Sequence, residues 1–176
     1  MADFNEIVAK TFKFEGGFQN SPNDSANYCN GKLIGTNRGI SAIGYSGYLH
    51  HCPTIEEVKA ITPEIARNVY RTNFWNPIQG DKIKDQSLAH IMFDTHIASG
   101  GEGVRRIKKA IKAVSKTPIF SSINTNAITS DQAEKINNLN PQVLFDKIHA
   151  GEVAQRKGLA QKDPNKYGGF LTGWLD

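Results

Sequence analysis

The feature that most constrains this chain is a helical pattern that runs directly into two glycines. Four apolar residues fall at i, i+3, i+4 and i+8, which predicts an amphipathic helix of about three turns: Phe4, Ile7, Val8 and Phe12. Gly16-Gly17 should end this helix, because glycine readily takes the left-handed conformation found at helix ends. Glu15 is therefore expected at the carboxyl end, where the helix dipole disfavours negative charge and so favours the protonated carboxyl group.

The next segment, residues 18 to 48, is rich in Gly, Asn and Ser and contains no convincing helical pattern. It predicts an irregular hairpin or small sheet with long loops. Asp24 and Thr36 lie on it. A carboxyl group at a helix end, with an acid and a hydroxyl on a ribbon that turns back, suits hydrolysis of a glycosidic bond. One group protonates the leaving oxygen, and the others hold or activate water and stabilise the cationic sugar. Taken alone, each residue is also what a helix end or a loop ordinarily contains.

After Pro53 the pattern is helical almost to the end of the chain. Thr54 and Thr62 are expected to start short helices, and Asn140 a longer one. Between them, Ser99-Gly100-Gly101 is expected to close one helix, and another follows it. A Ser/Thr/Asn-rich stretch at 115–128 is the best candidate boundary between two lobes. These patterns predict a mainly α protein, a helical bundle with a small irregular β-hairpin or sheet after the first helix.

The net charge of +4 suits an anionic partner such as bacterial cell wall or nucleic acid. The one concentrated basic run is expected to form the solvated face of a helix: Arg105, Arg106, Lys108, Lys109 and Lys112. No aromatic residues interleave it, as a groove for single-stranded nucleic acid would require, so we expect no nucleic-acid partner.

The two cysteines, Cys29 and Cys52, are too few for a disulfide scaffold and are expected to be ordinary buried or partly buried thiols. Cys52 follows His50 and His51, but neither cysteine belongs to a CxxC pair, so we expect no metal site. No apolar run approaches the roughly 20 residues that span a bilayer, and the first residues show no signal-peptide pattern. We therefore expect no membrane insertion.

The segment Glu15-Gly16-Gly17-Phe18-Gln19-Asn20-Ser21-Pro22-Asn23-Asp24, followed by Thr36 and Gly39-Ile40-Ser41, resembles the N-acetylmuramidases of glycoside hydrolase family 108. Further similarities continue downstream: Tyr70 with Trp75, Phe93-Asp94 with Gly100, and Gly173-Trp174 near the end. The trio is also similar to that of phage-type lysozymes, in which eight residues separate the Glu from the Asp and five separate the Asp from the Thr. Here eight residues separate Glu15 from Asp24, but eleven separate Asp24 from Thr36, so about six are added around residues 27–32.

The resemblance implies an α+β, lysozyme-like fold that cleaves the β-1,4 bond between N-acetylmuramic acid and N-acetylglucosamine in peptidoglycan. Glu15 would be the general acid, Asp24 would position or activate the attacking water, and Thr36 would help to hold it. It further implies a catalytic region at residues 1–100 and a helical peptidoglycan-binding region at 101–176, with the possibility of one continuous core left open. No cofactor is needed, and we expect a monomer.

Four aromatic residues are candidates for lining a sugar cleft. Phe18 and Tyr45 lie on the ribbon. Tyr70 and Trp75 lie on a predicted helix and fit a buried core equally well. His90 and Asp94 are four residues apart on another predicted helix and are expected to form a structural pair.

Two alternatives stay open: a non-catalytic peptidoglycan-binding module that uses the same cleft, and a glycanase acting on chitin or chitosan. Because no signal peptide is visible, we expect a protein made in the cytoplasm that reaches the wall after holin-type release, as a phage or prophage endolysin does, or by dedicated export.

Overall fold

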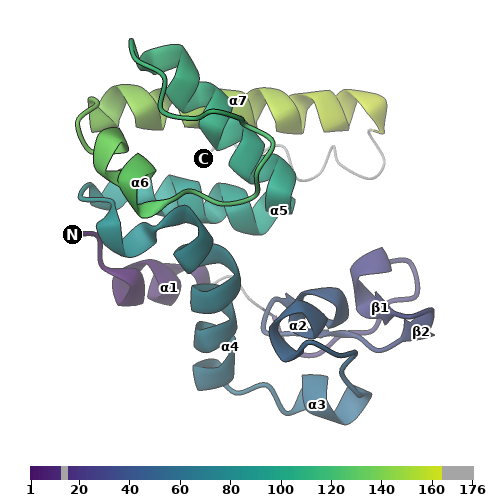
Figure 1. Cartoon of the computed structure of the whole chain (residues 1–176). Helices are drawn as coiled ribbons and strands as arrows, with labels where there is room; N and C mark the ends of the chain where they lie inside the picture. The colour runs from purple at the N-terminus through teal and green to yellow at the C-terminus, as the bar shows by residue number, and fades with distance from the viewer. Residues whose placement is uncertain (13–15, 164–176) are drawn as a thin grey trace. The chain divides into compact units, whose positions relative to one another are not determined.

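The computed structural model describes residues 1–12 and 16–163, so Glu15 and the closing segment 164–176 lie outside the described residues. The described part is mainly α-helical, with two short antiparallel strand pairs, which confirms the predicted α+β, lysozyme-like class (Figure 1). The chain divides into two compact units, which are treated separately below. The amino-terminal unit is Asp3–Pro77, and the carboxy-terminal unit is Met1–Ala2 together with the chain from Ile78 onward.

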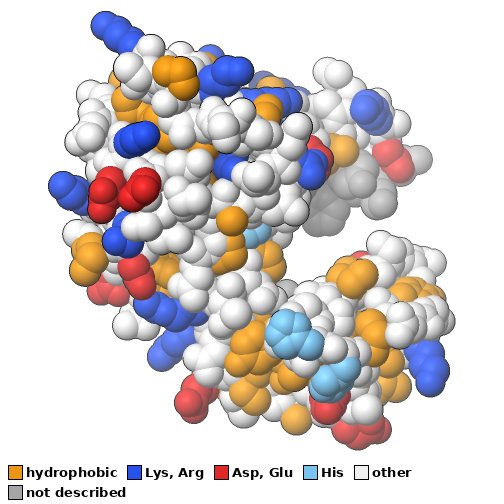
Figure 2. Space-filling model, viewed as in Figure 1, with side chains coloured by type: hydrophobic (Ala, Val, Ile, Leu, Met, Phe, Trp, Pro, Cys, Tyr) orange, Lys and Arg blue, Asp and Glu red, His pale blue; other side chains and the backbone are white. Residues whose placement is uncertain are grey.

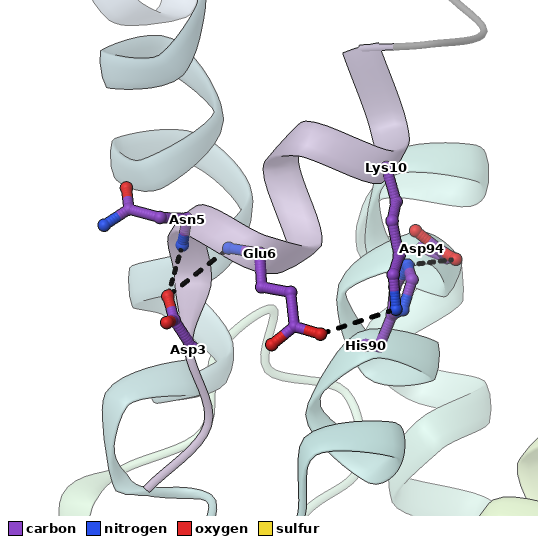
Figure 3. A network of polar contacts seen from close by, with 6 residues as sticks. All are labelled: Asp3, Asn5, Glu6, Lys10, His90 and Asp94. Atoms are coloured by element: carbon purple, nitrogen blue, oxygen red, sulfur yellow. Dashed lines mark hydrogen bonds and ion pairs between the residues drawn. The ribbon is translucent and has the colours of Figure 1, made fainter.

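The amino-terminal unit begins with α1 (Phe4–Phe12), which confirms the first predicted helix over its described residues. Asp3 caps it: Oδ1 accepts hydrogen bonds from the backbone N–H groups of Asn5 at 2.9 Å and Glu6 at 3.3 Å (Figure 3). The exposed ammonium group of Lys10 lies 3.7 Å from the Glu6 carboxylate one turn earlier. The expected end of this helix at Glu15 falls on residues that the structure does not describe.

Two tight hairpins follow α1. The first pairs β1 (Tyr28–Cys29) with β2 (Lys32–Leu33) after a single 3₁₀ turn, η1 (Ser25–Asn27). The second pairs β3 (Thr36–Asn37) with β4 (Ile40–Ser41). The loops within the two hairpins are therefore only two residues each, shorter than the long loops that were expected.

Helix α2 (Ala42–Leu49) overturns the expectation that residues 18 to 48 contain no helix. Its sequence contains two glycines and a serine, which lower helix propensity and hide the pattern. Caps at both ends compensate: the Ser41 hydroxyl accepts from the Gly44 N–H at 3.1 Å, and His50 ends the helix in the left-handed conformation.

The remaining helices of this unit are α3 (Ile55–Lys59) and α4 (Pro63–Tyr70). Both helices begin directly after the threonine that was expected to cap them. Thr54 forms a full capping box with Glu57, and Thr62 caps a helix whose first residue is proline. The chain then continues as a π-helical turn, η2 (Arg71–Trp75), and a 3₁₀ turn, η3 (Asn76–Ile78).

The carboxy-terminal unit contains η4 (Gly80–Lys82), α5 (Gln86–Val114), α6 (Ser130–Ile136) and α7 (Pro141–Lys162). Helices α5 and α7 pack along each other. Helix α5 breaks at Gly100, which has φ 55° and ψ −136°, and this confirms the two helices predicted on either side of the glycine pair.

The units meet in sequence at Pro77–Ile78, whereas the sequence pointed to a lobe boundary at 115–128. The chain on both sides of 115–128 belongs to the carboxy-terminal unit, so this segment is a loop within one unit. The division into a catalytic region 1–100 and a wall-binding region 101–176 concerns function and stays a prediction. No helix within residues 1–12 and 16–163 combines the length and apolar character needed to cross a membrane.

Candidate active site

The ribbon that carries Asp24 and Thr36 is built from the two hairpins. Each has a two-residue loop that ends in glycine: Asn30-Gly31 in the first and Arg38-Gly39 in the second. All four loop residues have positive φ, from 49° to 75°. Such loops match the twist of the paired strands, and Asn-Gly is the strongest short sequence signal for one. The residues added between Asp24 and Thr36 therefore form most of the first hairpin.

The segment before the first hairpin is tied to the start of the second. Gln19 and Thr36 exchange both backbone hydrogen bonds, each 2.8 Å long. The close approach depends on Gly35, which has φ +136° and lies against the Phe18 ring. This pairing fixes the position of Thr36 relative to the chain just after Gly16-Gly17.

Asp24 is half-buried and starts η1, where its Oδ1 accepts a hydrogen bond from the Ala26 N–H at 3.0 Å. Its Oδ2 lies 3.4 Å from the Gln19 side-chain amide nitrogen. One carboxylate oxygen is thus committed to the turn, and the other faces Gln19. The geometry is therefore compatible both with a structural role for Asp24 in the turn and with a role as a functional acid.

The residue that sequence reasoning missed is Asn27, whose side chain is completely buried (0% exposed). Its Oδ1 accepts a 2.6 Å hydrogen bond from the Thr36 hydroxyl, and its Nδ2 donates to Gln19 Oε1 at 2.9 Å. Because Gln19 also reaches Asp24, four side chains form one hydrogen-bonded set, called here the amide network: Gln19, Asp24, Asn27 and Thr36. No local pattern identifies Asn27, since an Asn in a turn-rich ribbon is ordinary; only the fold brings it to Thr36.

The structure therefore brings two of the three predicted catalytic residues, Asp24 and Thr36, into one network. The third, Glu15, lies outside the described residues, and its role stays a prediction. Chemically, the network presents a carboxylate and a hydroxyl held on one hydrogen-bonded ribbon, and these groups can orient a water molecule by hydrogen bonding.

The four aromatic candidates differ in exposure. Phe18 is half-buried, with the Lys59 ammonium group 5.1 Å from its ring centroid. Tyr45 is buried and stacks on Tyr48, with ring centroids 6.1 Å apart. Burial, then Glu57 and Tyr48, raise the pKa of the Tyr45 phenol. Hydrophobic side chains gather over α2 on the face seen in Figure 2. Within α2, Ile43 is 58% exposed.

The other two aromatic residues take the core position that their helix pattern also allowed. Trp75 is fully buried and packs on Phe4, with ring centroids 5.2 Å apart. Tyr70 is also buried, and its hydroxyl donates to the Arg38 backbone carbonyl at 3.3 Å. Because both rings are buried, neither offers an open face on which a sugar could stack. Their burial therefore gives no support to the expected contact with substrate.

The cysteines correct a further expectation. Cys29 and Cys52 form a disulfide, with Cα atoms 5.9 Å apart, so neither is a free thiol. It ties β1 to the chain just after α2. The pairing joins positions 23 residues apart, which is a contact that spacing alone does not reveal.

The basic run on α5 is only in part the solvated face that was expected: Lys109 and Lys112 are exposed, but Arg106 and Lys108 make contacts inside the unit. Arg106 donates to the buried Glu152 carboxylate of α7 through Nε at 2.7 Å and Nη2 at 3.1 Å. Lys108 is completely buried, and its Nζ donates to the Thr125 carbonyl at 2.9 Å and to the Thr125 hydroxyl. These two cations hold the carboxy-terminal unit together. On the visible face, Lys and Arg side chains are interspersed with Asp and Glu (Figure 2).

The predicted pair of His90 and Asp94 is confirmed, with Nε2 3.3 Å from the carboxylate (Figure 3). Desolvation raises the pKa of Asp94, against the lowering effects of His90 and Arg156. This pair and Glu152 line a pocket of about 370 Å³ between α5 and α7. Among residues 1–12 and 16–163, no cluster of three or more His, Cys, Asp or Glu side chains could hold a metal ion.

Comparisons with known proteins bear on both the family and the fold. The chain matches the family model described as Glycosyl hydrolase 108 over residues 8–100, more than half of its length, and the match includes all three predicted catalytic positions. A solved structure, that of Brucella abortus SagA, is 24% identical in sequence and superposes with a TM-score of 0.73. The alignment covers 98% of this chain and 87% of that chain, and at this identity it establishes the fold alone. A search of curated proteins found no match.

Proposed function

Because this chain belongs to the glycosyl hydrolase 108 family, and is therefore a glycoside hydrolase with a glycan substrate, we propose that it is an N-acetylmuramidase. In this proposal it cleaves the β-1,4 bond between N-acetylmuramic acid and N-acetylglucosamine in peptidoglycan. The observation that carries it is the amide network, which holds Asp24 and Thr36 together on the ribbon that follows Gly16-Gly17.

In the proposed reaction, the Glu15 carboxyl group gives its proton to the leaving glycosidic oxygen as the bond to the anomeric carbon breaks. A water molecule held by Asp24 and Thr36 attacks that carbon, and the proton it loses passes to the Asp24 carboxylate. The negative charge of Asp24 also stabilises the oxocarbenium-like transition state. Protonation and water attack supply all the chemistry, so the reaction needs no cofactor.

We propose that the protein acts on the wall outside the cytoplasm, after holin-type release from a phage or prophage or after dedicated export. The Cys29–Cys52 disulfide supports this, because disulfides form and persist in oxidising compartments and are rare in cytosolic proteins. The sequence pI of about 9.0 suits the anionic wall. We further propose that the helical region 101–176 contributes wall binding and that the protein works as a monomer.

The main alternative is a non-catalytic wall-binding module. The first hairpin favours it specifically, because it places added residues between Asp24 and Thr36. A glycanase acting on chitin or chitosan is the other alternative, since the same acid and water chemistry serves any β-1,4 hexosamine linkage.

The test measures turbidity loss and reducing-end release from purified Gram-negative sacculi, with soluble chitin oligomers in parallel. Wild type is compared with Glu15→Gln and with the matched control Glu6→Gln, which changes an exposed glutamate of α1. We expect wild type and Glu6→Gln to lyse sacculi, and Glu15→Gln to lose about 10²-fold or more in rate, as removal of a general acid does.

Three other outcomes contradict parts of the proposal. If wild type is inert on sacculi yet sediments with them, the protein is a binding module. If wild type cleaves chitin oligomers and leaves sacculi intact, the substrate is wrong. Full activity of Glu15→Gln removes Glu15 from the mechanism.

A further inference from the structure

The side chain of Asn27 has one allowed orientation, and a backbone group sets it. Its Nδ2 lies 3.0 Å from the Ser21 backbone carbonyl oxygen. A carbonyl oxygen only accepts hydrogen bonds, so the NH₂ group of Asn27 must face it. The Oδ1 atom of Asn27 consequently faces Thr36.

The same reasoning fixes Gln19. Its Oε1 accepts from the Ser21 backbone N–H at 2.9 Å, and that N–H only donates. Its Nε2 must then point the other way, where it lies 3.4 Å from both Asp24 Oδ2 and Asn27 Oδ1. The backbone of Ser21 thus orients both side-chain amides: its N–H group orients Gln19, and its carbonyl group orients Asn27.

These orientations decide what the Thr36 hydroxyl can do. A threonine hydroxyl has one proton to donate and two lone pairs that accept. Its proton is committed to Asn27 Oδ1 at 2.6 Å. Towards any further partner the Thr36 oxygen is therefore only an acceptor, and a water molecule bound there must donate a hydrogen to it.

We propose that Asn27 is a positioning residue for the hydrolysis reaction: by taking the Thr36 proton, it makes Thr36 an obligate acceptor for the attacking water. A water that donates one hydrogen to Thr36 and the other to the Asp24 carboxylate has its lone pair free for the anomeric carbon. Gln19 completes the arrangement by linking Asn27 to Asp24. The inference rests on the proposed function, and it adds two residues that the sequence did not identify.

The backbone of Asn27 supports the same arrangement. Its carbonyl oxygen accepts from the N–H groups of Ile34 at 2.8 Å and Gly35 at 3.1 Å, directly before Thr36. Side chain and main chain of one buried residue therefore hold the second hairpin in register with the turn that contains Asp24.

The test uses Asn27→Asp, which keeps the shape but replaces the NH₂ group with a carboxylate oxygen. This oxygen meets two acceptors, the Ser21 carbonyl and Gln19 Oε1, and their repulsion should displace the side chain from its position beside Thr36. With soluble peptidoglycan fragments at neutral pH, we expect kcat to fall roughly 10- to 100-fold, as misplacement of a reacting group does, with little change in KM. As the pH falls and the introduced carboxyl group is protonated, it again donates to Ser21 and accepts from Thr36. Activity relative to wild type should therefore recover on the acid side.

Asn37→Asp is the matched control. Asn37 is a second buried asparagine of the ribbon, and its Nδ2 donates to the backbone carbonyls of Val58 at 3.0 Å and Lys59 at 3.1 Å. Among the described residues, the hydrogen bonds of its side chain go to these two carbonyls and not to Thr36. Both variants should unfold at a lower temperature than wild type, because each loses buried hydrogen bonds. All rates are therefore measured under conditions in which circular dichroism shows that the variant is folded. Only Asn27→Asp should lose kcat and show the acid recovery.

A double-mutant cycle with Thr36→Val asks whether Asn27 acts through Thr36. We expect the double variant to be no slower than Thr36→Val alone, because the hydroxyl that Asn27 orients is already absent. Fully additive losses, or a folded Asn27→Asp with wild-type kcat, would overturn the inference while leaving the muramidase proposal intact. A wild-type protein that releases no reducing ends defeats the proposed function, and with it any role for Asn27 in the reaction.

Discussion

Gly35 and Phe18 lie so close together that a Cβ atom at position 35 would be 2.6 Å from the Phe18 ring. The same Cβ would be 2.8 Å from the Gln19 carbonyl oxygen, which accepts the Thr36 N–H. The φ of Gly35, +136°, is one that side-chain-bearing residues rarely adopt. The pairing that positions Thr36 thus depends on the absence of a side chain one residue earlier.

We therefore expect Gly35→Ala to lower the free energy of unfolding by about 2 kcal/mol or more, through backbone strain and the clash together. Urea unfolding measures it. Gly47→Ala is the control, because Gly47 lies in α2 with open space around it and ordinary φ. That change should stabilise by about 0.5–1 kcal/mol, since alanine favours a helix over glycine. Equal stability of the two variants would contradict the strained contact.

Asp24→Asn separates the charge of Asp24 from its structural role. The amide oxygen can still accept from the Ala26 N–H and cap η1, while the negative charge is lost. We expect kcat on peptidoglycan to fall by about 10²-fold or more, with the unfolding temperature unchanged. Asp85→Asn is the control, because Asp85 also caps a helix, accepting from the Leu88 N–H at 2.8 Å, and is not a site residue. Comparable activity in the two variants would remove Asp24 from the chemistry.

Replacing both cysteines, as Cys29→Ser with Cys52→Ser, should destabilise the protein by about 2–4 kcal/mol, mainly by freeing the unfolded chain. Wild type in dithiothreitol should lose stability similarly, whereas dithiothreitol should not affect the double variant. Denaturant titrations under the two redox conditions measure this. An effect of the reductant on the double variant would show that something other than this disulfide is responsible.

Lys108 should make stability rise with pH in the alkaline range. Burial lowers the pKa of its ammonium group below 10.5. Below the folded-state pKa the cost of the buried charge is fully present. Between that pKa and 10.5 the folded protein releases the proton before the unfolded chain does, so the free energy of unfolding increases as the pH rises.

Unfolding measured from pH 7 to 10.5 tests this against Lys108→Met, which has no proton to release. The difference in unfolding free energy, wild type minus variant, should grow with pH. Lys109→Met, at an exposed neighbouring position, is the control and should show no such trend. A flat or falling difference for Lys108→Met would contradict the prediction.

Much of the secondary structure was predictable because its signals are local. Thr54, Thr62 and Asn140 start helices where their side chains cap the first turn, and Gly100 breaks α5 because glycine tolerates its backbone angles. Helix α2 was missed for the same reason, since its glycines and serine weaken the local signal and its caps had to be seen in place.

The features of the candidate site also divide into those with a local sequence signal and those that only the fold reveals. The Glu-Gly-Gly motif and its spacing to Asp24 pointed to the family and to a glycoside hydrolase, because such motifs are written in consecutive residues. Three other features depend on residues that are apart in the chain, and consecutive residues do not reveal them. They are the disulfide, the hydrogen bonds of buried Lys108 to Thr125, and the hydrogen bond from Thr36 to Asn27.

The sequence by itself therefore determined the family, the mainly α class and the identity of the candidate acids. Only the tertiary structure decided which polar groups meet, and Asn27 illustrates why. An asparagine can donate or accept, and which of its atoms faces Thr36 depends on the Ser21 carbonyl that the folded ribbon places against it.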